Sequence, residues 1–163
     1  MTGDIMALQI ISLLIALAAV FVGPLVQVRI ARQSIRAQVR SSNRMEWIGT
    51  FRRTLTDYLS LCTRIVRLRT HFLDAKKAGK QVEPPDISKE LEEADKIFTG
   101  IRLLLKPGGE EETQLLNKLA EFSSFLEITT EQEFREYSDA REEVVRRARA
   151  ILKTEWERVK RLE

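Results

Sequence analysis

The chain has 163 residues, with 27 Lys and Arg against 24 Asp and Glu, which suffices for one ordinary domain and excludes a large multi-domain enzyme. Its single cysteine, Cys62, excludes an intramolecular disulfide and a cysteine-based zinc site, and its single histidine, His71, excludes a histidine-cluster metal site. The sequence has no glycine pattern of the phosphate-loop or dinucleotide-binding type, so we expect no metal and no cofactor.

The first predicted element is a long apolar segment from Ile5 to Val28. Its roughly 24 residues carry no charge, and at ~1.5 Å per residue a helix of this length reaches about 36 Å, enough to cross a bilayer core. A cleaved signal peptide would have a basic start and a shorter apolar run, and a buried core helix would need a larger remainder to cover it. We therefore predict a transmembrane anchor over residues 1–28 and a helical domain over residues 29–163.

Basic side chains directly after the predicted span indicate its orientation. Positive residues near a span are retained on the cytoplasmic side, and no acid follows the span before Glu46. We expect a bacterial inner-membrane protein with one span, its N-terminus outside and its C-terminal domain cytoplasmic. The basic residues also share one stripe of a continuing helix, where they can contact anionic membrane lipid or serve as a topology signal alone. They are Arg29, Arg32, Arg36, Arg40 and Arg44.

Small and polar residues gather on one face of the predicted span, at spacings of three and four. Small residues allow close backbone approach in lipid, and polar groups bond across a helix interface. A single span has no partner in its own chain, so this face predicts a homo-oligomer, or a ring in which it lines a polar pathway. The alternative is that Ala and Gly occur in spans without any role in assembly. The face consists of Gln9, Ser12, Ala16, Ala19, Gly23 and Gln27.

Four amphipathic helices are predicted in the C-terminal domain. The first continues from the span to about Lys77, with a break possible at Ser41–Asn43, and the second runs from Asp86 or Ser88 to about Leu105. The third starts in the acidic run at Glu110, and the fourth starts at Thr129 or Thr130 and runs almost to the C-terminus. No segment alternates with period two, so the fold class is all-α, a helical bundle in which the two long helices are antiparallel. The predicted core includes Phe51, Leu55, Tyr58, Cys62, Ile65, Ala94, Ile101, Leu115, Leu119, Phe122, Phe134, Tyr137, Val144, Ala148 and Ile151.

The segment from Arg44 to Arg52 reads R-x-x-W-I-x-x-F-R, and Ile101 to Pro107 reads I-x-L-x-L-K-P. Both resemble a widespread group of small bacterial single-span membrane proteins of unknown function, which has W-I-x-x-L-R after the span and Asn in place of Lys106. The resemblance covers roughly residues 5–126 and implies one span and a helical fold, with no established activity. From the residues themselves, we expect Trp47 to anchor the base of the bundle, Ile48 to join the core, and Arg44 and Arg52 to form structural ion pairs.

One group of residues has the composition of a catalytic site. Arg64, Arg67 and His71 share a helix face, and an Arg followed by a His resembles the R-x4-6-H motif of HEPN ribonucleases, in which His acts as acid or base and Arg holds phosphate. The helix is rich in Arg throughout, so the alternative is a solvated basic surface. Basic and acidic residues alternate along the last helix, which indicates intrahelical pairing rather than nucleic-acid binding.

Two functions follow from these patterns. The first is a non-enzymatic membrane protein that homo-oligomerises and forms or gates a pore, as a stress or phage-defence effector. The second is a membrane-tethered helical scaffold that binds a cytoplasmic protein partner. A HEPN-like ribonuclease is a minor alternative. A tether would tolerate replacement of Gln9 and Ser12 by Leu, whereas a pore would not.

Overall fold

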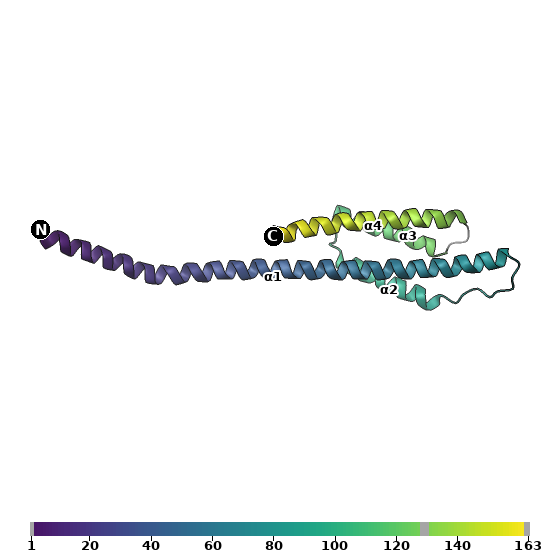
Figure 1. Cartoon of the computed structure of the whole chain (residues 1–163), viewed down its shortest axis with the longest axis horizontal. Helices are drawn as coiled ribbons and strands as arrows, with labels where there is room; N and C mark the ends of the chain where they lie inside the picture. The colour runs from purple at the N-terminus through teal and green to yellow at the C-terminus, as the bar shows by residue number, and fades with distance from the viewer. Residues whose placement is uncertain (1, 128–130, 162–163) are drawn as a thin grey trace. The chain divides into compact units, whose positions relative to one another are not determined.

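The protein is all-helical over the residues that its computed structural model describes, which are 2–127 and 131–161 for the backbone and 26–126 and 134–161 for the side chains. Within these ranges there is no strand. Figure 1 shows the element order. The elements are α1 (Thr2–Lys77), α2 (Ser88–Leu104), α3 (Glu110–Ser124), the short 3-10 helix η1 (Phe125–Glu127) and α4 (Glu131–Lys160). The predicted all-α fold class is confirmed.

The chain divides into two units, one up to Asn43 and one from Arg44 to Arg161. In the first unit, α1 is helical without interruption through Ser41–Asn43, so no break occurs there. The side chains described in this unit are almost all exposed, including the four arginines up to Arg40 and several large apolar residues. These apolar residues are Val26, Val28, Ile30, Ile35 and Val39.

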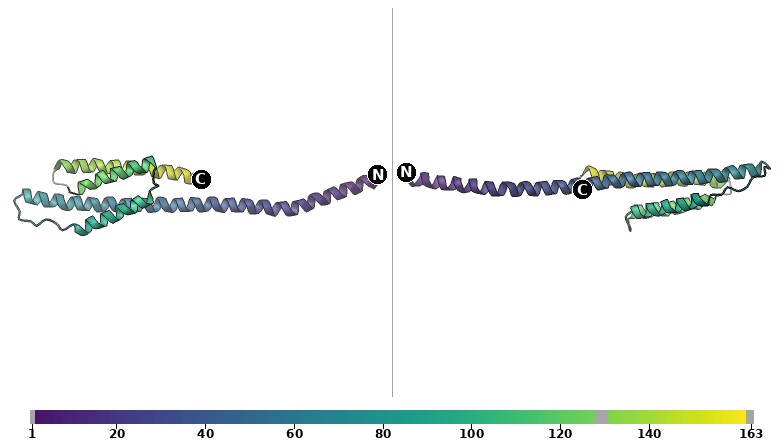
Figure 2. Two further views of the ribbon diagram at one scale, coloured as in Figure 1. Left: turned by 180° about the vertical axis from the view of Figure 1, so that it is seen from behind. Right: turned by 90° about the horizontal axis from the view of Figure 1, so that it is seen from below.

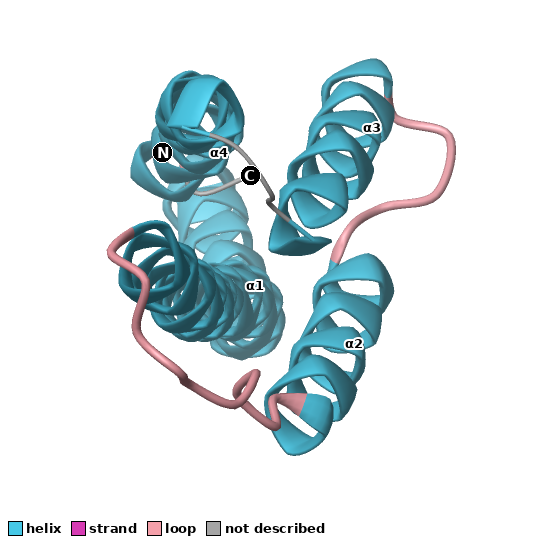
Figure 3. Cartoon of the chain, turned by 90° about the vertical axis from the view of Figure 1, so that its right-hand side faces the viewer, coloured by secondary structure: helices cyan, strands magenta, loops and turns pink. Residues whose placement is uncertain are grey.

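The second unit is a four-helix bundle. In Figure 3, α1 and α4 form one side of it and α2 and α3 the other. Figure 2 gives two further views of the α1–α4 pair. Contacts of Arg44 with Glu155 and of Thr63 with Tyr137 show that α1 and α4 run antiparallel, as expected from the sequence. The core lies between the two pairs. Its fully buried side chains include Phe51, Tyr58, Cys62, Ile65, Ile101, Leu115, Leu119, Phe122 and Val144.

Phe72 of α1 and Val159 of α4, which the helical repeats also predict to be inward, are only partly buried. The predicted core residues named above are buried except Phe134. This ring is 42% exposed, and it stacks on Tyr137 of its own helix at 6.3 Å between ring centroids. It lies in the first turns of α4, where the helical period still marks an inward position but neighbouring helices cover the ring only in part.

The helix ends follow from local chemistry. Gly79 has φ +72° and follows the last turn of α1, with its own N–H donated to Lys76 and that of Lys80 to Ala75, each at 3.0 Å. A side chain is strained in this left-handed region, so glycine ends the helix there as predicted. At the start of α2, the Ser88 backbone N–H donates to Asp86 Oδ1 at 3.1 Å. A hydrogen bond with the Ser88 side chain, together with this backbone bond, lowers the pKa of the Asp86 carboxyl group.

Candidate functional site

A groove between α1 and α4 is a candidate binding site among the described residues. It encloses about 760 Å³, within the range of ligand-binding clefts. Each helix contributes residues at positions i, i+3, i+4 and i+7, so two full turns of each helix line it. We call this feature the α1–α4 groove. Its lining residues are Met45, Ile48, Gly49 and Arg52 from α1 and Arg149, Leu152, Lys153 and Trp156 from α4.

The Arg44–Glu155 ion pair fixes the register of the two helices beside the groove. Arg44 Nε lies 3.2 Å from Glu155 Oε2, and both side chains are mostly covered. Because the helices are antiparallel, Met45 lies within about two residues of the level of Trp156, and seven residues further along α1 Arg52 lies within about two residues of the level of Arg149. At ~1.5 Å per residue these two levels are about 10.5 Å apart.

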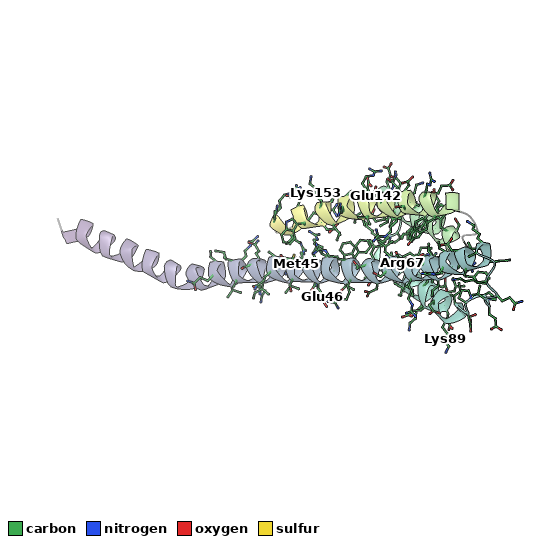
Figure 4. The ribbon with its side chains drawn as sticks, turned by 45° about the vertical axis from the view of Figure 1, so that its right-hand side comes forward. Met45, Glu46, Arg67, Lys89, Glu142 and Lys153 are labelled. Carbon is green, nitrogen blue, oxygen red and sulfur yellow. The ribbon has the colours of Figure 1, made fainter. Side chains whose placement is uncertain are left out.

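One level of the groove is apolar and open to solvent. Met45 is 40% exposed and Trp156 is 42% exposed, whereas Ile48 beneath them is only 5% exposed. Figure 4 shows Met45 on the side of α1 that faces α4 and Glu46 on the opposite side. At Gly49 an added Cβ would meet nothing within 4 Å, so the middle of the groove has room for a larger residue. Large apolar side chains left accessible together are typical of a binding surface.

The other level of the groove is basic. It is formed by Arg52 and Arg149, and Lys153 lies between the two levels. All three are exposed, and none of them forms an ion pair within the described part of the chain. No carboxylate lines the groove. Glu155, next to it, already contacts Arg44 and, at 2.5 Å, Arg158. The groove therefore presents three cations, none in an ion pair within the described residues, beside an apolar surface.

The three residues of the predicted ribonuclease motif do not converge on one point in a single chain. Arg64 reaches α2, where its guanidinium lies 3.1 Å from Glu90 Oε1. Arg67 lies near Tyr137 of α4 and acts to lower the pKa of its hydroxyl. His71 is exposed on α1. The two arginines thus interact with different helices, Arg64 with α2 and Arg67 with α4.

Reactive groups in the bundle interior are held in unreactive states. Burial raises the pKa of the Cys62 thiol from 9.0 to about 12, so it stays protonated at neutral pH. Burial also raises the pKa of Tyr58 and of Tyr137, although for Tyr137 the hydrogen bond with Thr63 and the charges of Arg141 and Arg67 oppose the increase. Tyr137 Oη and Thr63 Oγ1 are 2.8 Å apart. These groups are structural parts of the core.

The structure also places the residues predicted from the membrane-proximal motif. The Trp47 indole N–H donates to the Leu104 carbonyl at 2.7 Å, and its ring stacks on Phe51, so Trp47 ties the end of α2 to α1. The expected ion pair is present at Arg44. At Arg52 no ion pair forms within the described residues, because this side chain lies on the outer face of the α1–α4 pair, at the groove.

Most of the predicted oligomer face lies outside the residues whose side chains are described, from Gln9 to Gly23, and only the exposed Gln27 lies inside them. The predicted span from Ile5 to Val28 is likewise outside them as far as Leu25. Among the described residues, no helix is sufficiently long and apolar to cross a membrane.

Four residues of α1 and α4 that make the groove apolar at one level and basic at the other were not predicted from the sequence. Met45, Arg149, Lys153 and Trp156 follow the heptad-like spacing of their helices, but the sequence does not indicate that two stretches about 100 residues apart face each other. The one usable signal was the exposed tryptophan near the end of an otherwise strongly charged helix.

No metal site accompanies the groove: the described residues contain no cluster of three His, Cys, Asp or Glu side chains able to hold an ion. Comparison with protein families, with curated proteins and with solved structures found no match to this chain.

Proposed function

We propose that the chain is a non-enzymatic helical scaffold, anchored in the bacterial inner membrane by residues 1–28, whose cytoplasmic bundle binds a protein partner in the α1–α4 groove. The observation that supports this proposal is that exposed Met45 and Trp156 lie in one groove with Arg52, Arg149 and Lys153, which form no ion pair within the described residues. Aromatic, Met and Arg side chains are the residue types enriched in protein interfaces.

Site-specific photo-crosslinking in cells tests the proposal. A photoreactive residue at position 45 should give an adduct with another protein, whereas the same residue at position 46, on the opposite side of α1, should not. Gly49→Trp should abolish the adduct at position 45 because the indole fills the groove, and Gly49→Ala should leave it. Equal adducts at positions 45 and 46, or an adduct that survives Gly49→Trp, would exclude the groove as the binding site.

A second candidate function rests on the small and polar face of the predicted span, Gln9 to Gln27. Such a face favours association of spans in lipid, so a homo-oligomer that forms or gates a pore, as a stress or phage-defence effector, is the alternative role. The mass of the full chain in detergent separates the two functions. A defined oligomer that disappears with Gln9→Leu and Ser12→Leu, together with ion leak through the native protein, would favour the pore. Retained groove crosslinks in that double variant would favour the scaffold.

A further inference from the structure

The shape of the α1–α4 groove suits a helix. Two antiparallel helices present residues at i, i+3, i+4 and i+7, so their side chains form two ridges with a furrow between them over two turns. A furrow of this kind accepts the ridge of a third helix, as in recognition of amphipathic segments by helical grooves. The absence of a side chain at Gly49 widens the furrow at its middle.

The groove has a direction as well as a shape. Met45 and Trp156 form its apolar level, and Arg52 and Arg149 form its basic level about 10.5 Å away by helical rise, with Lys153 between them. On a helix, 10.5 Å is the distance from residue i to residue i+7. An occupant that satisfies both levels therefore carries an apolar side chain and a carboxylate seven residues apart.

The charge of the groove distinguishes between its candidate occupants. In a symmetric dimer formed through this groove, the three cations of each copy would enter one interface to which the groove contributes no carboxylate, which opposes association. A carboxylate-bearing partner instead supplies the missing charges, because no acidic residue of the described chain lines the groove.

We infer that the occupant is an acidic amphipathic helix of a protein partner, with an apolar anchor between Met45 and Trp156 and carboxylates at Arg52, Arg149 and Lys153. This inference rests on the proposed scaffold function and specifies the chemistry of the partner. The apolar anchor supplies contact area, whereas the carboxylates fix which end of the helix lies at which level and reject basic segments.

Two synthetic peptides test the inference against the full chain in nanodiscs of zwitterionic phosphatidylcholine. Each has about 16 residues, long enough to form a helix, with Leu in two successive turns and a pair of Glu seven residues further on. The matched control peptide has Lys in place of the Glu pair. Trp156 reports binding by its fluorescence, and Trp156→Phe identifies the share of the signal due to Trp47.

The acidic peptide should bind on the order of tenfold more tightly than the basic one, since two or three exposed charge pairs each contribute a factor of a few. The difference should shrink at high salt. Arg52→Glu with Arg149→Glu should invert the preference, so that the basic peptide binds better. Inversion cannot result from misfolding, which would abolish binding of both peptides.

Gly49→Trp should remove binding of the acidic peptide while Gly49→Ala retains it. Equal affinity for the two peptides would overturn the inference. The inference would also be overturned if only vesicles of anionic lipid, and not the acidic peptide, changed the Trp156 fluorescence. A fluorescence change that results only from self-association of the chain would overturn it as well. If crosslinks at position 45 persist while the peptide preference is absent, the scaffold function stands and only the acidic helix is wrong. If both are absent, the scaffold function fails as well.

Discussion

The two ends of the α1–α4 pair differ although the same helices form both. At one end, which we call the closed end, Tyr137 is 4% exposed and is hydrogen-bonded to Thr63. Its ring also stacks on Phe122 of α3 at 5.0 Å between ring centroids. At the other end, which we call the open end, Trp156 and Met45 are partly exposed to solvent, and Trp156 has no ring contact within the described residues. One end of the pair is core and the other is surface.

The length of α3 is one cause of this difference. Phe122 contacts Tyr137 and Gln114 bonds to Arg147, so α3 runs antiparallel to α4 and begins about level with Ala150. With 15 residues against 30, α3 covers only about half of α4. Trp156 lies beyond it. Apolar spacing along a helix therefore marks which side chains can be buried, and the extent of the neighbouring helices decides which ones are.

Truncating one aromatic residue at each end should give the largest contrast. Tyr137→Ala should lower the free energy of unfolding by about 3–5 kcal/mol, because it leaves a cavity and removes the hydrogen bond to Thr63, whose hydroxyl keeps only its bond to the Leu59 carbonyl. Trp156→Ala should cost about 1 kcal/mol or less, since this side chain is already partly hydrated. Urea unfolding of the full chain in detergent, followed by circular dichroism, measures both. Similar losses would mean that Trp156 is covered in the assembled protein.

The second prediction concerns the buried thiol of Cys62 at the closed end. Its pKa of about 12 in the folded chain lies above its usual 9.0, so the folded state holds this proton more tightly than the unfolded state. The contribution to stability is complete below pH 9 and is lost as the pH rises from 9 to 12, by roughly 1.4 kcal/mol per pH unit. Cys62→Ala should flatten this part of the curve of unfolding free energy against pH.

A residual decline in Cys62→Ala is expected above pH 10, because burial also raises the pKa values of Tyr58 and Tyr137. Alkylation provides an independent measurement: at pH 8 the native thiol should react with iodoacetamide only after unfolding. Rapid alkylation of the folded protein, or identical pH curves for the two proteins, would show that the closed end admits water.

The third prediction concerns the hydrogen bond that joins the helices at the closed end. Thr63→Val and Tyr137→Phe each remove one hydroxyl of the pair while largely keeping its volume. Each should cost about 1 kcal/mol, and the double variant should cost less than the sum because both single variants already lose the same Thr63–Tyr137 hydrogen bond. Strict additivity in this double-mutant cycle would show that the two hydroxyls do not interact.

The same contrast explains how much could be predicted from the sequence. The ends of α1 at Lys77 and of α2 near Leu105 were predictable because glycine and proline signals are local. The core of α3 was predictable because the helical repeat identifies its buried face. The exposure of Phe134 and the presence of the groove could not be predicted, since both depend on where a neighbouring helix ends. Trp47 was recognised as an anchor, but its bond to Leu104 joins residues 57 apart in the sequence.

The smallest expected effect belongs to the Arg44–Glu155 ion pair at the open end. Both side chains are partly hydrated, so a double-mutant cycle with Arg44→Gln and Glu155→Gln should give a coupling of about 0.5 kcal/mol, falling toward zero in 1 M salt. Arg158 also contacts Glu155, which limits what the removal of Arg44 can cost. A coupling above about 2 kcal/mol that persists in salt would require the pair to be desolvated. In that case a bound helix or a second chain would already cover this end of the α1–α4 pair in the purified protein, and adding the acidic peptide would change the coupling little. With the pair hydrated as described, the acidic peptide should instead raise the coupling, because its binding removes water from the open end.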